Sequence, residues 1–219
     1  MVSNKHESHN VLDFAGYAFP VEGLGPGRRL AIWLRGCGRR CPGCLSPELW
    51  EPGEASPVEG IADTLAPLLP RADGLTVSGG EPFDQAEALT ALITSLRRES
   101  DVEVLVYTGY LLEELRARGG AATVLLESID ILIDGPFEES ASNTLQWRGS
   151  DNQRVHLLTP RAQRHAEAAR APMPEPRPLQ VQMTGLSRYR IIGIPRRGDI
   201  DAYRTAMAAR GLEVGPDNG

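Results

Sequence analysis

The sequence has few cysteines and no long apolar segment. Its three cysteines, Cys37, Cys41 and Cys44, lie in one short stretch. A disulfide framework needs an even number of thiols, so three clustered cysteines favour metal or redox chemistry instead. No apolar run approaches the ~18 residues of a membrane-spanning helix. The first ten residues, MVSNKHESHN, lack the basic-then-apolar pattern of a secretion signal. These absences predict a cytoplasmic protein with no membrane partner and with reduced thiols.

Acidic residues outnumber basic ones, 29 to 23. The chain of 219 residues has a formal net charge of -6, whereas a nucleic-acid-binding domain is expected to be basic. The composition therefore does not indicate a nucleic-acid partner. The length fits one principal domain with a small appendage. The proline-rich stretch APMPEPRP at 171–178 predicts an extended linker. It predicts a core at 1–170 and a C-terminal extension at 179–219.

The core shows strands that alternate with helices, which predicts an α/β fold with a parallel sheet. A first helix is expected to start at Ser56, Pro57 and Glu59, a pattern typical of a helix N-terminus. A second helix is expected from about Asp84, and a third over 111–118. Five units are too few for a closed eight-stranded barrel, so we expect a partial, TIM-like (β/α) barrel. The five short apolar runs that we interpret as buried parallel strands are 29–34, 74–80, 102–109, 130–135 and 154–159.

The extension has a pattern of its own. The segments 179–185 and 189–195 alternate like strands, and 198–211 has the period of an amphipathic helix with Ile200, Tyr203 and Met207 on one face. The sequence therefore predicts a small β-β-α unit. Such a unit is expected to cover the barrel, dock a partner or protect a sheet edge.

Polar and glycine-rich segments follow the predicted strands. The cysteines come after the first strand, the segment 79–82 (GGEP) after the second, 108–110 (TGY) after the third and 134–137 (DGPF) after the fourth. Parallel α/β folds place reactive groups at the carboxyl ends of their strands. These segments are therefore expected to converge on one face.

The cysteine spacing, C-x3-C-x2-C, has several interpretations. Zinc prefers four ligands, but His156 and His165 are distant in sequence and no local Cys/His spacing supplies a fourth. Three merely buried cysteines fit poorly, because the loop is rich in glycine and arginine. Three thiolates on a four-iron cluster would leave one iron open for chemistry. No further cysteine is present to hold a second cluster.

The cysteine loop followed by Gly79-Gly80-Glu81-Pro82 one βα unit later resembles the radical S-adenosylmethionine (AdoMet) superfamily. The ordered segments VEGLGPGRRLAIWLRGCGRRCPGC, VSGGEPF, VYTGY, ILIDGPF and LQWRGSDNQRV narrow the resemblance. They are similar to the family of small proteins that activate anaerobic ribonucleotide reductase, and they cover roughly residues 10–160.

The resemblance implies a site and its cofactors. Cys37, Cys41 and Cys44 would hold a [4Fe-4S] cluster, and the amine and carboxylate of AdoMet would chelate its open iron. The residues expected to border the methionine and ribose parts of AdoMet are Ser78, Gly79, Gly80 and Glu81, and Thr108, Gly109 and Asp134, respectively. Because the Gly80 backbone is expected to lie against AdoMet, a bulky replacement should weaken AdoMet binding and spare the cluster. Trp147, Arg148, Asn152 and Gln153 match a late family motif without a definite role.

The resemblance also implies a reaction and partners. A reduced cluster cleaves AdoMet to methionine and a 5′-deoxyadenosyl radical, which removes hydrogen from a glycine of a partner enzyme. An electron donor of the flavodoxin or ferredoxin type would be needed. Two alternatives stay open: the same radical chemistry on a peptide or small molecule, and a non-enzymatic iron–sulfur or zinc protein, which would leave GGEP unexplained.

Overall fold

A six-stranded sheet forms the centre of the molecule. The structure, a computed structural model, describes residues 10–183 and 189–210. The inner strands β3, β5, β6 and β7 are parallel, and the edge strands β2 and β8 are antiparallel to their neighbours. The protein is therefore a mixed α/β fold with a mostly parallel central sheet. In spatial order the strands are β2 (Phe14–Val21), β3 (Arg29–Leu34), β5 (Gly74–Gly79), β6 (Val104–Tyr107), β7 (Ile131–Asp134) and β8 (Arg154–Leu157).

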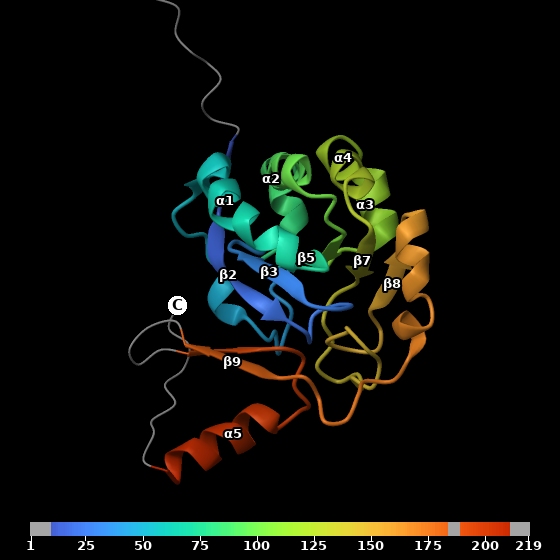
Figure 1. Cartoon of the computed structure of the whole chain (residues 1–219). Helices are drawn as coiled ribbons and strands as arrows, with labels where there is room; N and C mark the ends of the chain where they lie inside the picture. Colours follow the sequence, from blue (N-terminus) through green and yellow to red (C-terminus); the bar gives the residue numbers. More distant parts are fainter. Residues whose placement is uncertain (1–9, 184–188, 211–219) are drawn as a thin grey trace, which may run out of the picture.

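Four helices cover one face of this sheet. They lie in a row above it in Figure 1 and bury their apolar faces in the main core cluster. Residues such as Leu89, Leu92 and Leu96, spaced by three or four positions, are fully buried there. These helices are α1 (Val58–Leu65), α2 (Ala86–Glu99), α3 (Leu112–Arg118) and α4 (Ala121–Glu127). Short 3-10 helices occur at Pro47–Leu49, Ala66–Arg71, Pro82–Gln85, Pro160–His165 and Ala168–Arg170.

The last strand of the sheet corrects the prediction of five parallel strands. β8 lies where it was expected, but it runs antiparallel to β7. A parallel pair needs a crossover, usually through a helix. The connection 135–153 contains no helix, so the chain turns back on itself and β8 must run the other way.

One further local prediction needs correction, and two elements, β2 and α4, were missed. The edge strand β2 was not predicted at all. The helix expected from Ser56, Pro57 and Glu59 is present as α1, with Glu59 in its first turn. Its N-cap is Pro57 and not Ser56, no side chain caps it, and both residues belong to a short strand, β4 (Ser56–Pro57), which pairs with β1 (Val11–Leu12). The helix α4 was also missed. Its sequence, AATVLLE, is too short to show a clear period.

The C-terminal extension has the predicted β-β-α order. It consists of β9 (Gln180–Met183), β10 (Tyr189–Ile192) and α5 (Asp199–Ala208), with β9 and β10 antiparallel. It lies on the side of the sheet opposite to α1 and α2 (Figure 1). Residues 184–188 and 211–219 of the predicted extension lie outside the described residues.

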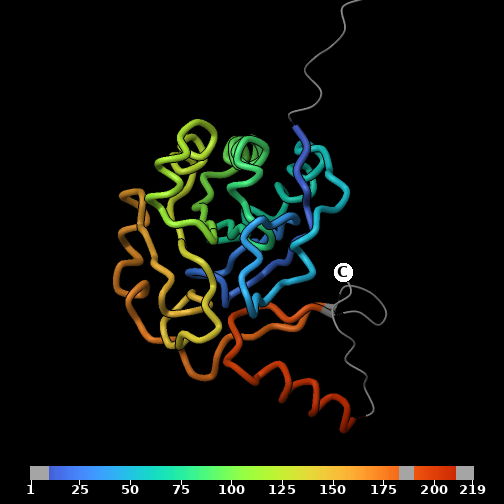
Figure 2. The backbone as a smooth tube through the Cα atoms, turned by 180° about the vertical axis from the view of Figure 1, so that it is seen from behind, coloured from blue at the N-terminus to red at the C-terminus, as the bar shows by residue number. Residues whose placement is uncertain are grey.

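The extension packs on the core. The side chains of Ile192 and Ile194 are buried in a cluster with Val21 and Ala31 of β2 and β3, among others. Figure 2 shows the preceding chain passing along the β8 side of the molecule and then beneath the sheet. Met173, in this stretch, is buried and donates its backbone N–H to the carbonyl of Thr144 (2.6 Å). The predicted linker is therefore extended but held against the core, and the domain boundaries at 170 and 179 stay a prediction.

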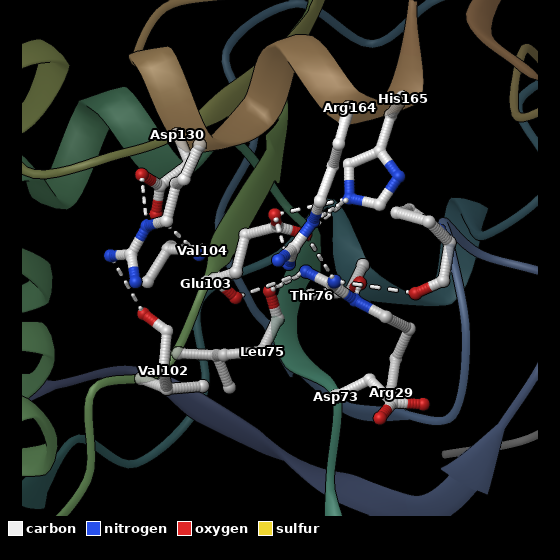
Figure 3. Close-up of polar contacts among 12 residues, drawn as sticks. Arg29, Asp73, Leu75, Thr76, Val102, Glu103, Val104, Asp130, Arg164 and His165 are labelled. Atoms are coloured by element: carbon white, nitrogen blue, oxygen red, sulfur yellow. Dashed lines mark hydrogen bonds and ion pairs between the residues drawn. The ribbon is translucent and has the colours of Figure 1, made fainter. Parts of the chain in front are cut away.

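A buried ionic network ties the starts of the inner strands together. Arg29, at the start of β3, is fully buried and donates to the Glu103 carboxylate (3.0 Å) and to Thr76 Oγ1 (3.1 Å). Arg164 and His165 contact the same carboxylate from outside (Figure 3). These residues lie at the end of the sheet opposite to the cysteines, because the cysteines follow the other end of β3.

No helix in the described part of the chain is long and apolar enough to cross a membrane.

Candidate functional site

A cavity of about 430 Å³ opens at the carboxyl ends of β3, β5 and β6. All sequence-predicted site residues line it except Asp134. These lining residues are Cys37, Cys41, Cys44, Ser78, Gly79, Gly80, Glu81, Thr108 and Gly109. The expected convergence of the loops on one face is therefore present, and the volume is that of a small-molecule site.

The cysteine loop has a defined backbone. Cys41, Pro42, Gly43 and Cys44 form a turn in which the Cys44 N–H donates to the Cys41 carbonyl (3.1 Å). Gly43 has a φ of 72°. Proline followed by a residue with positive φ is typical of a type II turn, which favours glycine at the third position. The turn brings the second and third thiols close together in space.

The three thiols lie in the cysteine loop without a disulfide partner. All three are free and half-buried. Within residues 10–183 and 189–210, no three Cys, His, Asp or Glu side chains converge on a common point that could hold one metal ion. In a four-iron cluster, each of the three thiolates would bind a different iron. Burial raises the pKa of the Cys44 thiol, while the Ser46 N–H and the Trp50 side chain act in the opposite direction.

The glycines after β5 let two loops approach each other closely. The Gly80 N–H donates to the carbonyl of Leu34 (2.7 Å), and the Glu81 N–H donates to that of Gly36 (2.8 Å). A Cβ on Gly80 would lie 2.3 Å from the Gly36 oxygen. A side chain at Gly80 would therefore push against the loop that carries Cys37. The prediction that a bulky residue there spares the cluster stays untested, but the close approach of the loop backbone argues against it.

Glu81 organises the neighbouring loop from inside the protein. Its carboxylate is buried and accepts hydrogen bonds from Thr108 Oγ1 (2.8 Å), Gly109 N (2.8 Å) and Phe83 N (3.0 Å). Burial raises the pKa of Glu81 to about 7, although these three hydrogen bonds oppose the shift. One side chain thus links the loops after β5 and β6.

The Asp134 side chain is engaged away from the cavity. It accepts hydrogen bonds from the Leu112 N–H (2.7 Å) and from Arg154 (2.9 Å for Nε), and it lies 3.0 Å from His156 Nε2. Burial acts to raise its pKa, but these contacts outweigh burial and hold the pKa well below the ordinary range. In this structure Asp134 orients the start of α3, and its neighbour Gly135 lines the cavity. The expected role at the ribose stays untested.

The late motif supports the loop after β7. The Gln153 side chain donates to the carbonyl of Gly135 (3.0 Å) and accepts from Gly149 N (2.8 Å), and Asn152 donates to the Pro136 carbonyl (2.9 Å). Trp147 is buried in the core, and Arg148 is buried with one hydrogen bond to Ala169 O (2.8 Å). Of these four residues, Gln153 reaches the cavity wall.

The C-terminal extension forms one wall of the cavity, with residues that the sequence did not identify as part of the site. The segment 191–195, together with Ile200 and Arg204 of α5, also lines the cavity. The amphipathic pattern of α5 indicated an apolar face with Ile200 on it, but not what that face would meet. An adjoining cavity of about 520 Å³ shares Leu45, Phe137 and Ile200 with the first, among others, and continues it toward the segment 139–144.

A family model described as "4Fe-4S single cluster domain" matches residues 23–156. Several curated proteins are also similar to this chain in sequence. The anaerobic ribonucleoside-triphosphate reductase-activating protein of Escherichia coli (strain K12) is 32% identical over 150 residues, which cover 64% of this chain and 96% of the relative. The protein of the same description from Vibrio cholerae is 34% identical over 155 residues, with the same coverage. Its counterpart from Enterobacteria phage T4 is 29% identical over 148 residues, which cover 64% of this chain and 91% of the relative.

Among solved structures, QueE from Escherichia coli aligns over 46% of this chain and 52% of its own, with 18% identity and a TM-score of 0.38. This likeness is too weak to carry an argument. The family model covers more than half of the chain and includes all three cysteines, and the relatives align over nearly their full length. The chain belongs to the 4Fe-4S single-cluster family that contains the anaerobic ribonucleoside-triphosphate reductase-activating proteins.

Proposed function

We propose that this protein is a radical AdoMet enzyme that activates a partner enzyme by forming a glycyl radical in it. The partner would be an anaerobic ribonucleotide reductase, as the name of the relatives indicates. The observation that carries the proposal is the meeting of three thiols with the Gly79–Gly80 backbone and the Thr108–Gly109 loop around one cavity.

Separate sets of residues in this chain would bind the cluster and AdoMet. Cys37, Cys41 and Cys44 would hold a [4Fe-4S] cluster. When bound and reduced, this group supplies the electron that cleaves AdoMet to methionine and a 5′-deoxyadenosyl radical. The backbone at 78–81 would orient the methionine part of AdoMet, and Thr108 and Gly109 the ribose part. Glu81 would hold these two segments together, because its carboxylate accepts hydrogen bonds from Thr108 and Gly109.

Three finer points belong to this proposal. The mostly parallel sheet is interpreted as a partial barrel of the TIM type, with the cavity at its carboxyl end. A one-electron donor of the flavodoxin or ferredoxin type would reduce the cluster. The protein would act in the cytoplasm, where its thiols stay reduced.

Anaerobic reconstitution tests the proposal. Because the three thiols line one cavity, the protein should take up about four irons and four sulfides per chain. With AdoMet and a strong reductant, it should slowly form 5′-deoxyadenosine and methionine without a partner. Cys41→Ala should lose both the cluster and the cleavage, because two thiolates hold the cluster poorly.

Two results would contradict the proposal. One is a single bound zinc without broad visible absorption after reconstitution. The other is a full cluster that never cleaves AdoMet. With the partner reductase present, electron paramagnetic resonance (EPR) should detect a glycyl radical.

A second candidate function is supported by the extension. Residues 191–195, Ile200 and Arg204 line the cavity but lie outside the segment that the family model matches. The same radical could therefore act on a peptide or small molecule that the extension recognises. Identifying the protein that co-purifies anaerobically would separate the two: a glycyl-radical enzyme favours activation, and its absence favours modification.

A further inference from the structure

The Arg39 side chain reaches from the cysteine loop to the loop after β6. Its guanidinium carbon lies 4.8 Å from the centre of the Tyr110 ring. A Cβ on Gly109 would lie 3.1 Å from Arg39 Cγ and 3.5 Å from Arg39 Nε. Arg39 is half-buried and lines the same cavity as Gly109. One side chain therefore connects the loop proposed for the cluster with the loop proposed for the ribose of AdoMet.

The ring on which Arg39 packs is itself held in place. The Tyr110 hydroxyl donates to Asp84 Oδ1 (2.9 Å). The guanidinium carbon of Arg118 lies 4.2 Å from the centre of the same ring, and Arg118 Nη2 lies 3.5 Å from Asp84 Oδ1. A cation this close to an aromatic face is attracted to the ring. Tyr110 therefore orients the Arg39 guanidinium, while the nearby carboxylate of Asp84 pairs with Arg118.

The Arg39 guanidinium has no acceptor of its own. Across residues 10–183 and 189–210, its N–H groups meet no hydrogen-bond acceptor, and no carboxylate pairs with it. Its neighbour Arg40 differs, because it pairs with Glu51 (2.6 Å) on the surface. A guanidinium carries donors and no acceptor. A ligand that fills the cavity displaces the water around these donors, which costs free energy unless the ligand brings acceptors of its own.

We propose that Arg39 binds the adenosine part of AdoMet, with its guanidinium donating hydrogen bonds to acceptor atoms of the ribose and adenine. The amine and carboxylate of AdoMet would be taken up by the open iron, so these are the acceptors that AdoMet has left. The Arg39 stem packs against Gly109, which belongs to the segment proposed for the ribose. The inference rests on the proposed function, because it requires AdoMet in this cavity.

Arg39→Met tests the proposal, since methionine keeps a long stem and removes the donors. The full chain is reconstituted with its cluster, kept oxidised so that AdoMet is not cleaved, and titrated anaerobically with AdoMet by calorimetry. The Kd for AdoMet should rise about tenfold. Arg40→Met is the matched control, because Arg40 does not line the cavity, and it should bind AdoMet like wild type. Equal affinities in wild type and Arg39→Met, with full iron content, would overturn the proposal.

A spectroscopic measurement separates contact with AdoMet from an effect on the cysteine loop. Arg39→Met is saturated with AdoMet that carries 13C in its S-methyl group, then reduced and frozen at once. Pulsed EPR should show the same 13C coupling to the cluster as in wild type, because the methionine end of AdoMet stays on the iron. A changed coupling would mean that Arg39 acts through the cysteine loop, and it would overturn the proposal.

Arg39→Lys supplies the test if Arg39→Met fails to hold iron. Lysine keeps the positive charge but lacks the planar fork of N–H donors, so the Kd for AdoMet should rise about threefold. An unchanged affinity in this variant would overturn the proposal. Failure of the wild type to take up about four irons, or to bind AdoMet at all, would instead overturn the proposed function.

Discussion

At the scale of single residues, Glu81 has the most unusual environment in the site. Its motif, Gly79-Gly80-Glu81-Pro82, could be found in the sequence, and its position beside the cavity could be predicted from the rule for parallel strands. The burial of its carboxylate could not, because burial depends on how the loops after β5 and β6 close over it. That closure brings Thr108 and Gly109 to the same carboxylate.

The first prediction at this scale concerns pH. The pKa of Glu81 is raised in the folded protein to about 7 from an ordinary value of 4.5, so the folded state binds this proton more tightly than the unfolded state. The contribution of Glu81 to stability is therefore fully present below about pH 4.5 and is lost as the pH rises through 7. The full change is on the order of 3 kcal/mol. Urea unfolding under anaerobic conditions at pH 5, 6, 7 and 8 measures it.

The matched variants for this measurement are Glu81→Gln and Glu59→Gln. Glutamine at 81 cannot ionise, so the fall in stability between pH 5 and pH 8 should largely disappear, although its amide meets the Gly109 N–H and lowers stability overall. Glu59 is exposed at the start of α1, and its variant should keep the wild-type pH dependence. An unchanged pH dependence in Glu81→Gln would show that Glu81 does not titrate in this range.

At the scale of elements, the inner strands could be predicted and the edges of the sheet could not. The runs that became β3, β5, β6 and β7 are apolar without alternation, because each inner strand is buried on both faces. The sequence FAGYAFPV of β2 contains glycine and proline and has mixed burial, so it lacks that signal. The direction of β8 depends on the absence of a helix before it, which is a property of the connection and not of the strand.

The element-scale prediction concerns the network at the starts of the strands. Glu103 joins Arg29 of β3 to Arg164 and His165 (Figure 3). Removing one partner of a buried ion pair leaves the other charge uncompensated. Glu103→Gln should therefore lower the free energy of unfolding by about 3 kcal/mol, measured by urea unfolding. Iron content per chain should be unchanged, because the cysteines lie at the opposite end of β3.

The control for this prediction is Asp101→Asn. Asp101 is 91% exposed and pairs with Arg161 (2.8 Å). An exposed ion pair contributes about 1 kcal/mol or less, so this variant should be close to wild type. Equal losses in the two variants would mean that the Arg29 network does not hold the strands together.

At the scale of the whole molecule, the cavity has walls of two kinds. One belongs to the segment that the family model matches and carries the thiols. The other comes from the extension, which is anchored at both sides. Gln180 Nε2 donates to the Pro20 carbonyl (2.9 Å), and Asn143 Nδ2 donates to the Pro195 carbonyl (2.8 Å). Since Ile192 and Ile194 also cover β2 and β3, deleting the extension would expose core residues as well as open the cavity.

Point variants on α5 therefore test substrate docking better than a truncation. Ile200 and Arg204 lie one helical turn apart and both line the cavity, whereas Arg210 follows the same helix and is not part of the lining. If the extension docks the substrate, Ile200→Ala/Arg204→Ala should reduce hydrogen abstraction from the partner by about tenfold, a loss of about 1.4 kcal/mol of transition-state stabilisation. The partner-free cleavage of AdoMet should keep its rate, because that reaction needs only the cluster and bound AdoMet. Arg210→Ala should match wild type in both assays. A double variant that activates its partner at the full rate would assign the extension a purely structural role, in which Ile192 and Ile194 shield one face of the sheet and the substrate is recognised by the core alone.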